Sequence, residues 1–313
     1  MSGRRAAEGA EREGAGRQAT PWRELADLAW RSAGLPGFLR RRLGIAEAAA
    51  AVAERVRRRE ARFLRSVDRL VFGVRRSPLR RLLAWAGCEA GDLRRMVEAD
   101  GVEAALACLH AAGVFVSADE FRGRVDLVRP GLRLAVEPRN FDNPLLSGVA
   151  RLAGGVGGAT SGSTGRGVPV RYSWRFLAAE AADEALLLHS HGLQEAPLAF
   201  WLPGPPGIAG LHNLLVHAKL GCPPQRWYSP SPAPGSGDGP AFWADRGWRA
   251  ARRCLPALGP APEWLPLERA AEVARWLAVF RRPARPAVLK CFASAALRVA
   301  GAAAAAGLDL TGC

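Results

Sequence analysis

Glycine and small hydroxyl residues are concentrated in one short segment, GGVGGATSGSTGRGVPV, at residues 154–170. Phosphate is bound by several donors that converge on it, and successive backbone N–H groups provide them where glycine permits positive φ and close approach. Hydroxyl side chains add donors and can reach a phosphate-bound magnesium ion. The segment therefore predicts a phosphate-binding loop with these residues: Thr160, Ser161, Gly162, Ser163, Thr164 and Gly165.

Two common nucleotide-binding motifs do not fit this segment. A Walker loop requires a lysine before its hydroxyl residue, and no lysine lies nearby; a dinucleotide fingerprint that starts at Gly155 needs glycine or alanine where Thr160 stands. A flexible Gly/Ser linker is the other interpretation, although the strand-like sequence VPVRY follows the segment immediately. Spacing alone leaves the phosphate loop and the linker both open.

Histidine pairs raise the question of a metal site. His189 and His191 stand at the end of an expected helix, where imidazole favourably interacts with the last carbonyls. His212 and His217 are five residues apart, so their rings point to different faces of a helix. No cysteine or carboxylate completes a ligand set at metal-binding spacing, and no protein-held metal is expected.

Composition and charge narrow the function classes. The 313 residues are 49% hydrophobic, which is enough for a sizeable core, and the net charge is +15. Only Lys219 and Lys290 are lysines, so the basic residues are nearly all arginines in a chain rich in alanine, glycine and proline. This skew resembles coding bias, and arginines between Arg40 and Arg81 would form a solvated helix face. Nucleic-acid binding is therefore disfavoured but stays an alternative.

Cysteine spacing and apolar stretches indicate the compartment. The six cysteines include no Cys-x-x-Cys pair, which fits a reducing cytoplasm. The N-terminus carries acidic residues and no apolar central region, unlike a secretory signal. The most apolar stretch, CFASAALRVAGAAAAAGL, is interrupted by Arg298 and is dominated by alanine, so we expect a packed helix and no membrane span.

The pattern along the chain predicts an α/β protein in three parts: a disordered tail at 1–20, a helical region at 21–113 and an α/β domain at 114–313. Strands alternate with helices in the last part, which predicts a mainly parallel sheet with flanking helices. Expected strands are 114–121, 125–128, 132–137, 168–172, 198–202, 226–229 and 287–292. Expected helices are 176–191, 211–220, 242–254, 267–280 and 294–306.

The pattern of the last residues predicts the start of another strand. Gly307 can cap the final helix, and LDL alternates as a strand would. The sheet is therefore expected to be incomplete at the C-terminal end of this chain.

The loop sequence ATSGSTGRGVPV resembles the Thr-Ser-Gly-Ser/Thr-Thr-Gly-x-Pro signature of the adenylate-forming, AMP-binding superfamily, whose loop wraps the β- and γ-phosphates of ATP. FWLPGPPGIAGLHNLLVHAKLG followed by RWYS is similar to the next superfamily segment, which borders the acyl pocket. The resemblance covers about 115–313, and the phenylacetate-CoA ligase-like and acyl-protein-synthetase-like branches are the most similar.

The resemblance implies an AMP-forming ligase that uses ATP and Mg²⁺. A carboxylic acid would attack the α-phosphate to give an acyl-adenylate, and coenzyme A or another thiol would then give a thioester. The loop residues would hold the departing pyrophosphate, with Thr164 reaching ATP-bound magnesium, and Arg171 would stand near the signature lysine position. The implied substrate-pocket residues are Trp201, Gly210 and His212. Trp201 and His212 can equally be packing residues.

Departures from the signature limit what the resemblance implies. Three residues separate Gly165 from Pro169 where the signature has one, and Val170 replaces the signature lysine. The superfamily's motifs for adenine, ribose and magnesium, and its catalytic lysine, belong to a portion that would follow residue 313. The sequence therefore resembles an N-terminal portion that works with a C-terminal portion or partner chain. The alternative is a truncated or degenerate homologue that binds nucleotide or serves as an interaction module.

Overall fold

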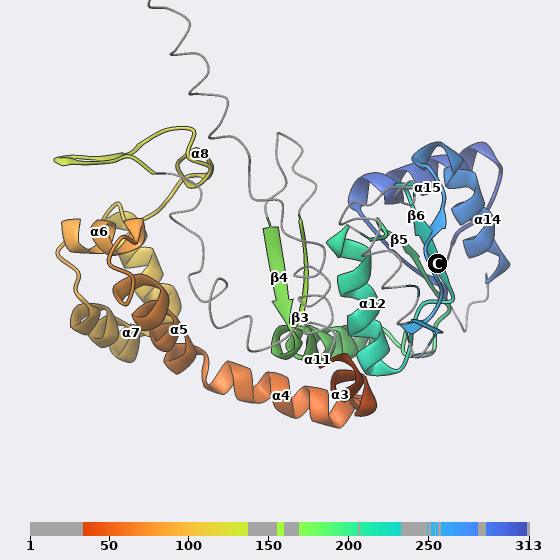
Figure 1. The fold of residues 1–313 in the computed structure, drawn as a ribbon, viewed down its shortest axis with the longest axis horizontal. Coiled ribbons are helices and arrows are strands. Elements are labelled where there is room, and N and C mark those ends of the chain that lie inside the picture. The colour runs from red at the N-terminus through yellow and green to blue at the C-terminus, as the bar shows by residue number, and fades with distance from the viewer. Residues whose placement is uncertain are drawn as a thin grey trace, which may run out of the picture. The chain divides into compact units, whose positions relative to one another are not determined.

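The chain forms two compact units in this computed structural model (Figure 1). The structure describes residues 34–136, 155–159, 169–205, 207–232, 249, 252–253, 255, 258–280 and 286–311, with the backbone alone at 157–159 and 169–171. The α/β unit comprises Met1–Arg42, Gly154–Ala178 and Ser190–Cys313, and the helical unit comprises Leu43–Ala153 and Ala179–His189. The expected tail at 1–20 and the helix expected at 242–254 lie outside the described residues, apart from isolated positions in the latter.

A four-stranded parallel sheet forms the centre of the α/β unit. Its order is β7 (Glu263–Trp264), β6 (Arg226–Ser229), β5 (Leu198–Trp201) and β8 (Val288–Cys291). All four residues of β5 are buried, as expected of a short apolar run in a sheet covered on both faces. The α/β class and a parallel sheet are thus confirmed, whereas the two-residue strand β7 was not anticipated.

Helices cover both faces of this sheet. On one face, α14 (Ala270–Val279), which follows the 3₁₀ turn η4 (Leu267–Arg269), packs with α15 (Ala293–Ala305). Their buried residues form one core with alternate residues of the strands: Ala199, Trp201, Tyr228, Leu265, Val273, Ala274, Leu277, Ala295 and Val299. On the other face lies α12 (Ile208–Leu220), whose His217 contacts the Phe200 ring. Strand alternation explains why neighbouring residues of β5 enter different layers.

Helix α3 (Leu35–Arg40) and the first residues of α11 (Trp174–Ser190) also belong to this unit. The short α3 contacts α12, and Lys219 donates hydrogen bonds to the carbonyls of Phe38 at 2.8 Å and Arg41 at 2.6 Å. These bonds satisfy carbonyls at the end of α3, where a cation is also favoured by the helix dipole. The ring of Trp174, the first residue of α11, contacts the Phe38 ring in a tilted arrangement with centroids 5.1 Å apart.

A separate antiparallel pair, β3 (Gly155–Ala159) and β4 (Pro169–Ser173), contacts α12 through β3. The sequence predicted the strand at 168–172 but placed 155–159 in the glycine-rich loop, and it expected a mainly parallel sheet. The segment 160–168 explains the difference, because a parallel connection needs a longer crossover whereas a short loop joins antiparallel neighbours.

The helical unit contains α4 (Ile45–Arg57), α5 (Arg59–Val67), the π-helical turn η1 (Asp68–Phe72), α6 (Pro78–Trp85) and α7 (Ala90–Ala111). Helices were expected here. The α7 helix is interrupted at Gly101, whose φ of 83° is compatible with glycine and not with a continuous helix. The core residues of these helices are Leu64, Val71, Leu83, Leu93, Val97, Ala105 and Leu109.

A short hairpin, β1 (Leu127–Arg129) and β2 (Leu132–Leu134), completes this unit. The segment 114–121 was predicted as a strand, but residues 118–121 instead form the short helix α8 (Ala118–Phe121). Ser117 and Glu120 form a capping box at its start: the Ser117 N–H donates to Glu120, and the Glu120 N–H donates to Ser117 Oγ. These local hydrogen bonds compete successfully with strand pairing.

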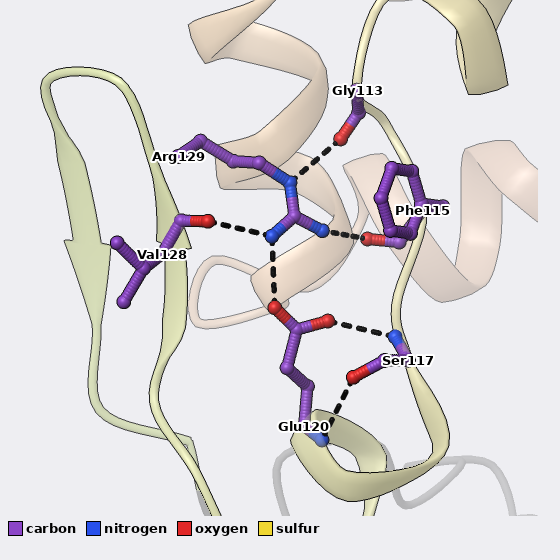
Figure 2. Close-up of polar contacts among 6 residues, drawn as sticks. All are labelled: Gly113, Phe115, Ser117, Glu120, Val128 and Arg129. Carbon is purple, nitrogen blue, oxygen red and sulfur yellow. Dashed lines mark hydrogen bonds and ion pairs between the residues drawn. The ribbon is translucent and has the colours of Figure 1, made fainter.

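A buried arginine joins the hairpin to the preceding segment (Figure 2). The Arg129 guanidinium donates to the carbonyls of Gly113, Phe115 and Val128 and to the Glu120 carboxylate at 2.8 Å. The Arg129 and Glu120 side chains are only 10% and 8% exposed, so the ion pair is shielded from water. The Arg129 hydrogen bond, together with those of Ser117, lowers the pKa of Glu120 against the opposing effect of burial.

Candidate nucleotide-binding site

The candidate phosphate loop connects the two strands of an antiparallel hairpin. In the register of β3 and β4, Ala159 is opposite Pro169, so both ends of the segment 160–168 are held side by side. The predicted residues Thr160, Ser161, Gly162, Ser163, Thr164 and Gly165 lie outside the described residues. What the structure describes is therefore the stem on which this segment is mounted. A linker between independent elements does not require such a stem.

Glycine is required at the first residue of the stem. Gly155 has a φ of 144°, and a Cβ at this position would lie 2.2 Å from the carbonyl oxygen of Tyr172. Any side chain would therefore push β3 away from β4 at the pair Gly155–Ser173. Gly155 thus has a role in strand pairing, whereas the sequence interpretation placed it in the loop.

Arg171, the predicted cation near the phosphates, lies in the middle of β4 opposite Gly157. Its backbone is described, and its side chain lies outside the described atoms. The strand position places Arg171 two residues from the end of the loop at Pro169.

An aromatic cluster surrounds the base of the hairpin. The Tyr172 ring lies 5.3 Å from Phe176 and 4.7 Å from His212, and Phe176 lies 6.3 Å from His212. Ser173 fixes the turn between β4 and α11, because its Oγ accepts a hydrogen bond from the Phe176 N–H at 3.1 Å. The Phe176 side chain is 43% exposed, so an aromatic surface is accessible beside the stem.

The three predicted pocket residues do not lie together. His212 belongs to the aromatic cluster with Tyr172 and Phe176. Trp201 is fully buried on the opposite face of the sheet, where its indole N–H donates to the Leu265 carbonyl at 3.0 Å. Trp201 thus has the packing role that the sequence also allowed for it.

Gly210 has a packing role next to the sheet. A Cβ on Gly210 would lie 2.4 Å from both the Pro203 carbonyl oxygen and the Trp227 ring. Trp227 itself is fixed by a hydrogen bond from its indole N–H to the Leu202 carbonyl at 2.9 Å. The absence of a side chain at Gly210 therefore lets α12 approach the turn that follows β5, and this sets the position of His212 two residues later.

Tyr172 and Phe176 are the site residues that the sequence analysis did not single out. An aromatic pair in which one residue ends a strand and the other lies four positions further on is common in cores. Only the proximity to a glycine-rich loop could have directed attention to it. The spacing of His212 and His217 did predict that their rings face different surroundings, and the structure places them against different partners.

The basic segment of the helical unit forms many ion pairs. Arginines of α4, α5 and α7 contact carboxylates in the same unit, and the pairs are Arg55–Asp183, Arg57–Glu54, Arg59–Glu103, Arg94–Asp68 and Arg95–Asp92. These contacts offset the positive charge that the sequence shows in this stretch. They do not strengthen the nucleic-acid alternative.

Metal-ion clusters and membrane-spanning helices are both absent from the described residues. No group of three histidine, cysteine, aspartate or glutamate side chains in the described ranges could hold a metal ion. None of the helices in those ranges has both the length and the apolar character of a membrane span.

The class that the fold defines is that of a mixed α/β protein with a short parallel sheet between helices and a separate helical unit. No protein-family model, no curated protein and no solved structure matches the chain.

Proposed function

We propose that the chain binds the triphosphate of MgATP at residues 160–165 and contributes to the activation of a carboxylic acid as an acyl-adenylate. The observation that carries the proposal is the hairpin stem, which holds the two ends of a glycine- and hydroxyl-rich segment opposite each other at Ala159 and Pro169. A stem of this kind restricts the loop, and a restricted loop can direct several N–H and O–H donors toward one anion.

The proposed chemistry has two steps. A carboxylate oxygen of the acid attacks the α-phosphorus of ATP, the bond to the β-phosphate oxygen breaks, and pyrophosphate leaves. A thiol such as that of coenzyme A then attacks the acyl carbon, and AMP leaves with the bonding electrons. Positioning and charge neutralisation provide most of the catalysis in phosphoryl transfer.

Individual loop residues have distinct proposed roles. The hydroxyls of Ser161 and Ser163 and the N–H groups of Gly162 and Gly165 would hold the β- and γ-phosphate oxygens. Thr164 fits contact with a magnesium ion bound to these phosphates, since hydroxyl and phosphate oxygens are ligands that Mg²⁺ prefers. Bound magnesium would neutralise charge on the departing pyrophosphate.

The aromatic cluster supports a substrate surface at the base of the stem, at the end of β3 and β4 opposite the loop. Tyr172 leaves the stem directly, and the exposed Phe176 ring stacks on it with an interplanar angle of 19°. We assign this surface, together with His212, to the organic part of the substrate. An aromatic face of this kind accepts adenine or an aromatic acid by stacking.

A second candidate function is nucleotide binding without catalysis by this chain alone. It is favoured by the contacts of the two lysines that the sequence contains. Lys219 bonds the carbonyls at the end of α3, and Lys290 lies against His217, so both already take part in the fold. A catalytic ammonium of the kind that the resemblance implies would then come from another portion or chain.

Binding and turnover measurements separate these candidates. We expect MgATP to bind the wild-type chain, and Ser163→Ala with Thr164→Ala to weaken binding by at least about tenfold, because two donors to a charged group are lost. The matched control is Ser294→Ala with Thr311→Ala, which removes two exposed hydroxyls far along the sequence. ATP–pyrophosphate exchange with a panel of carboxylic acids then tests catalysis: exchange supports the ligase, and binding without exchange supports the second candidate.

A further inference from the structure

Three reactive side chains meet at the C-terminal end of α12: those of His217, Cys222 and Lys290. Cys222 Sγ lies 3.6 Å from His217 Nδ1, and Lys290 Nζ lies 3.4 Å from His217 Nε2. His217 is fully buried, whereas Cys222 and Lys290 are partly exposed. The two contacts connect a sulfur, an imidazole and an ammonium, and such connected groups can polarise one another.

The end of α12 builds one half of this arrangement. Gly221 adopts the left-handed conformation with a φ of 77°, and its N–H donates to the Ala218 carbonyl. The Cys222 N–H donates to the His217 carbonyl at 3.1 Å, which completes a Schellman motif. The chain reversal brings the Cys222 side chain back onto the imidazole five residues earlier.

Strand alternation in β8 builds the other half. Cys291 packs with the α14 and α15 core, so the neighbouring Lys290 is directed to the face that α12 covers. Lys290 is opposite Phe200 in the parallel register, and the Phe200 ring meets His217 edge-on at 5.4 Å. The sheet and the helix thus fix His217 from two sides.

The hydrogen-bonding capacity of each group determines which atom donates and which accepts in these two contacts. A lysine ammonium can only donate, so His217 Nε2 is the acceptor and the neutral ring carries its proton on Nδ1. That N–H then points to Cys222 Sγ, where it stabilises a thiolate. The ammonium of Lys290 adds positive charge at the far end of the imidazole.

A second cation lies at the end of the helix. The Arg42 side chain is so close to Gly221 that a Cβ there would meet Arg42 Cζ at 3.2 Å. The free carbonyls at the C-terminal end of a helix disfavour a thiolate nearby. Two carbonyls at this end, those of His217 and Ala218, already accept the N–H groups of Cys222 and Gly221, which reduces this effect. Arg42 beside Gly221 and Lys290 beside His217 thus place two positive charges next to the neighbours of Cys222.

We propose that Cys222 is a nucleophilic thiol, activated by His217 and Lys290, that reacts with low-molecular-weight disulfides carrying negative charge. In this step the Cys222 thiolate attacks one sulfur of the disulfide, a new S–S bond forms, the original S–S bond breaks, and its electron pair leaves with the second thiolate. The disulfide is the oxidant, and the protein gains a mixed disulfide at Cys222. The proposal is independent of the nucleotide site.

The test follows reaction with 5,5′-dithiobis(2-nitrobenzoate) at limiting reagent, with each modified cysteine located by peptide mass. We expect Cys222 to react about tenfold faster than the exposed Cys108, because thiolate is the reacting species and the reagent is anionic. In Lys290→Met, Cys222 should slow by about tenfold while Cys108 keeps its rate. A Cys222 rate no greater than that of Cys108, or an unchanged rate in the variant, overturns the proposal.

Cys291 reports whether the Lys290 variant remains folded, because it lies next to the substitution and its partly buried side chain packs against the core. If Cys291 accelerates, Arg42→Gln at an exposed position is the deciding variant. It should slow the anionic reagent several-fold and leave the neutral 2,2′-dithiodipyridine unchanged, since only the charged reagent senses the cation. If Arg42→Gln changes the rate of neither reagent relative to wild type, the electropositive site is contradicted.

Discussion

Replacing Arg129 by alanine tests the energetic importance of the buried ion pair in the helical unit. The substitution removes the hydrogen bonds to the carbonyls of Gly113, Phe115 and Val128 and leaves the Glu120 carboxylate with Ser117 as its remaining partner (Figure 2). Removing one partner of a buried pair costs several kcal/mol, because the other charge stays in a site shielded from water. We expect a loss of about 3 kcal/mol in the opening free energy of the hairpin.

Hydrogen–deuterium exchange of the segment 113–134 measures this loss locally, which is appropriate for a chain with two units. A change of about 3 kcal/mol corresponds to exchange that is on the order of 10² faster. Arg133→Ala on the same hairpin is the matched control, since its pair with Asp126 has a 77% exposed arginine side chain. That control should cost less than about 1 kcal/mol.

The pH dependence of the same measurement gives a signed prediction. Arg129 lowers the pKa of Glu120 in the folded state, so the ion pair contributes stability above the unfolded pKa of about 4.3 and loses it as pH falls through the folded value. The difference between wild type and Arg129→Ala should therefore shrink in acid. If Arg129→Ala and Arg133→Ala accelerate exchange equally at neutral pH, the reasoning about burial is refuted.

Three other perturbations have expected outcomes. Gly210→Ala should destabilise the α/β unit by about 2 kcal/mol in urea unfolding, because a Cβ there meets backbone and an indole ring, whereas Gly301→Ala in open space should be neutral or stabilise by up to about 1 kcal/mol; equal effects would contradict the close approach. Trp201→Phe should cost about 1 kcal/mol by the same measurement, through loss of its indole hydrogen bond, and an unchanged midpoint would argue against that bond. Iodoacetamide should modify Cys88 far more slowly than Cys108, because burial raises the pKa of the Cys88 thiol, and comparable rates would contradict its burial.

Local sequence pattern was sufficient for the elements that form the α/β layers. The apolar runs that form β5, β6 and β8 are short and are bounded by turn residues. They alternate along the chain with segments of helical periodicity, so their parallel pairing could be expected. The helix α12 (Ile208–Leu220) also covers the expected helix 211–220, and it begins three residues earlier than expected.

Other elements depend on contacts that the sequence does not reveal. The strand at 155–159 is rich in glycine, which has low strand propensity, and it forms because β4 pairs with it. The helix at 118–121 could have been recognised, because Ser117 and Glu120 have the spacing of a capping box. The strand prediction was based on the β-type residues of this segment alone.

The candidate sites also differ in whether one segment of the sequence or tertiary packing brings their residues together. The candidate loop at 160–165 was predicted from its glycine and hydroxyl residues together with the family resemblance, and its residues lie outside the described ones. The cluster of Tyr172, Phe176 and His212, and the line of Cys222, His217 and Lys290, join distant segments whose proximity follows from tertiary packing. No spacing rule connects a lysine with a histidine 73 residues away.

Titration of MgATP into the wild-type chain and into Ser163→Ala/Thr164→Ala is the most direct test of the proposed function. Wild type should bind with a saturable signal that the double variant weakens by at least about tenfold, while Ser294→Ala/Thr311→Ala retains wild-type affinity. Equal affinity in all three proteins, or no binding in any of them, would contradict a triphosphate site in the loop between β3 and β4.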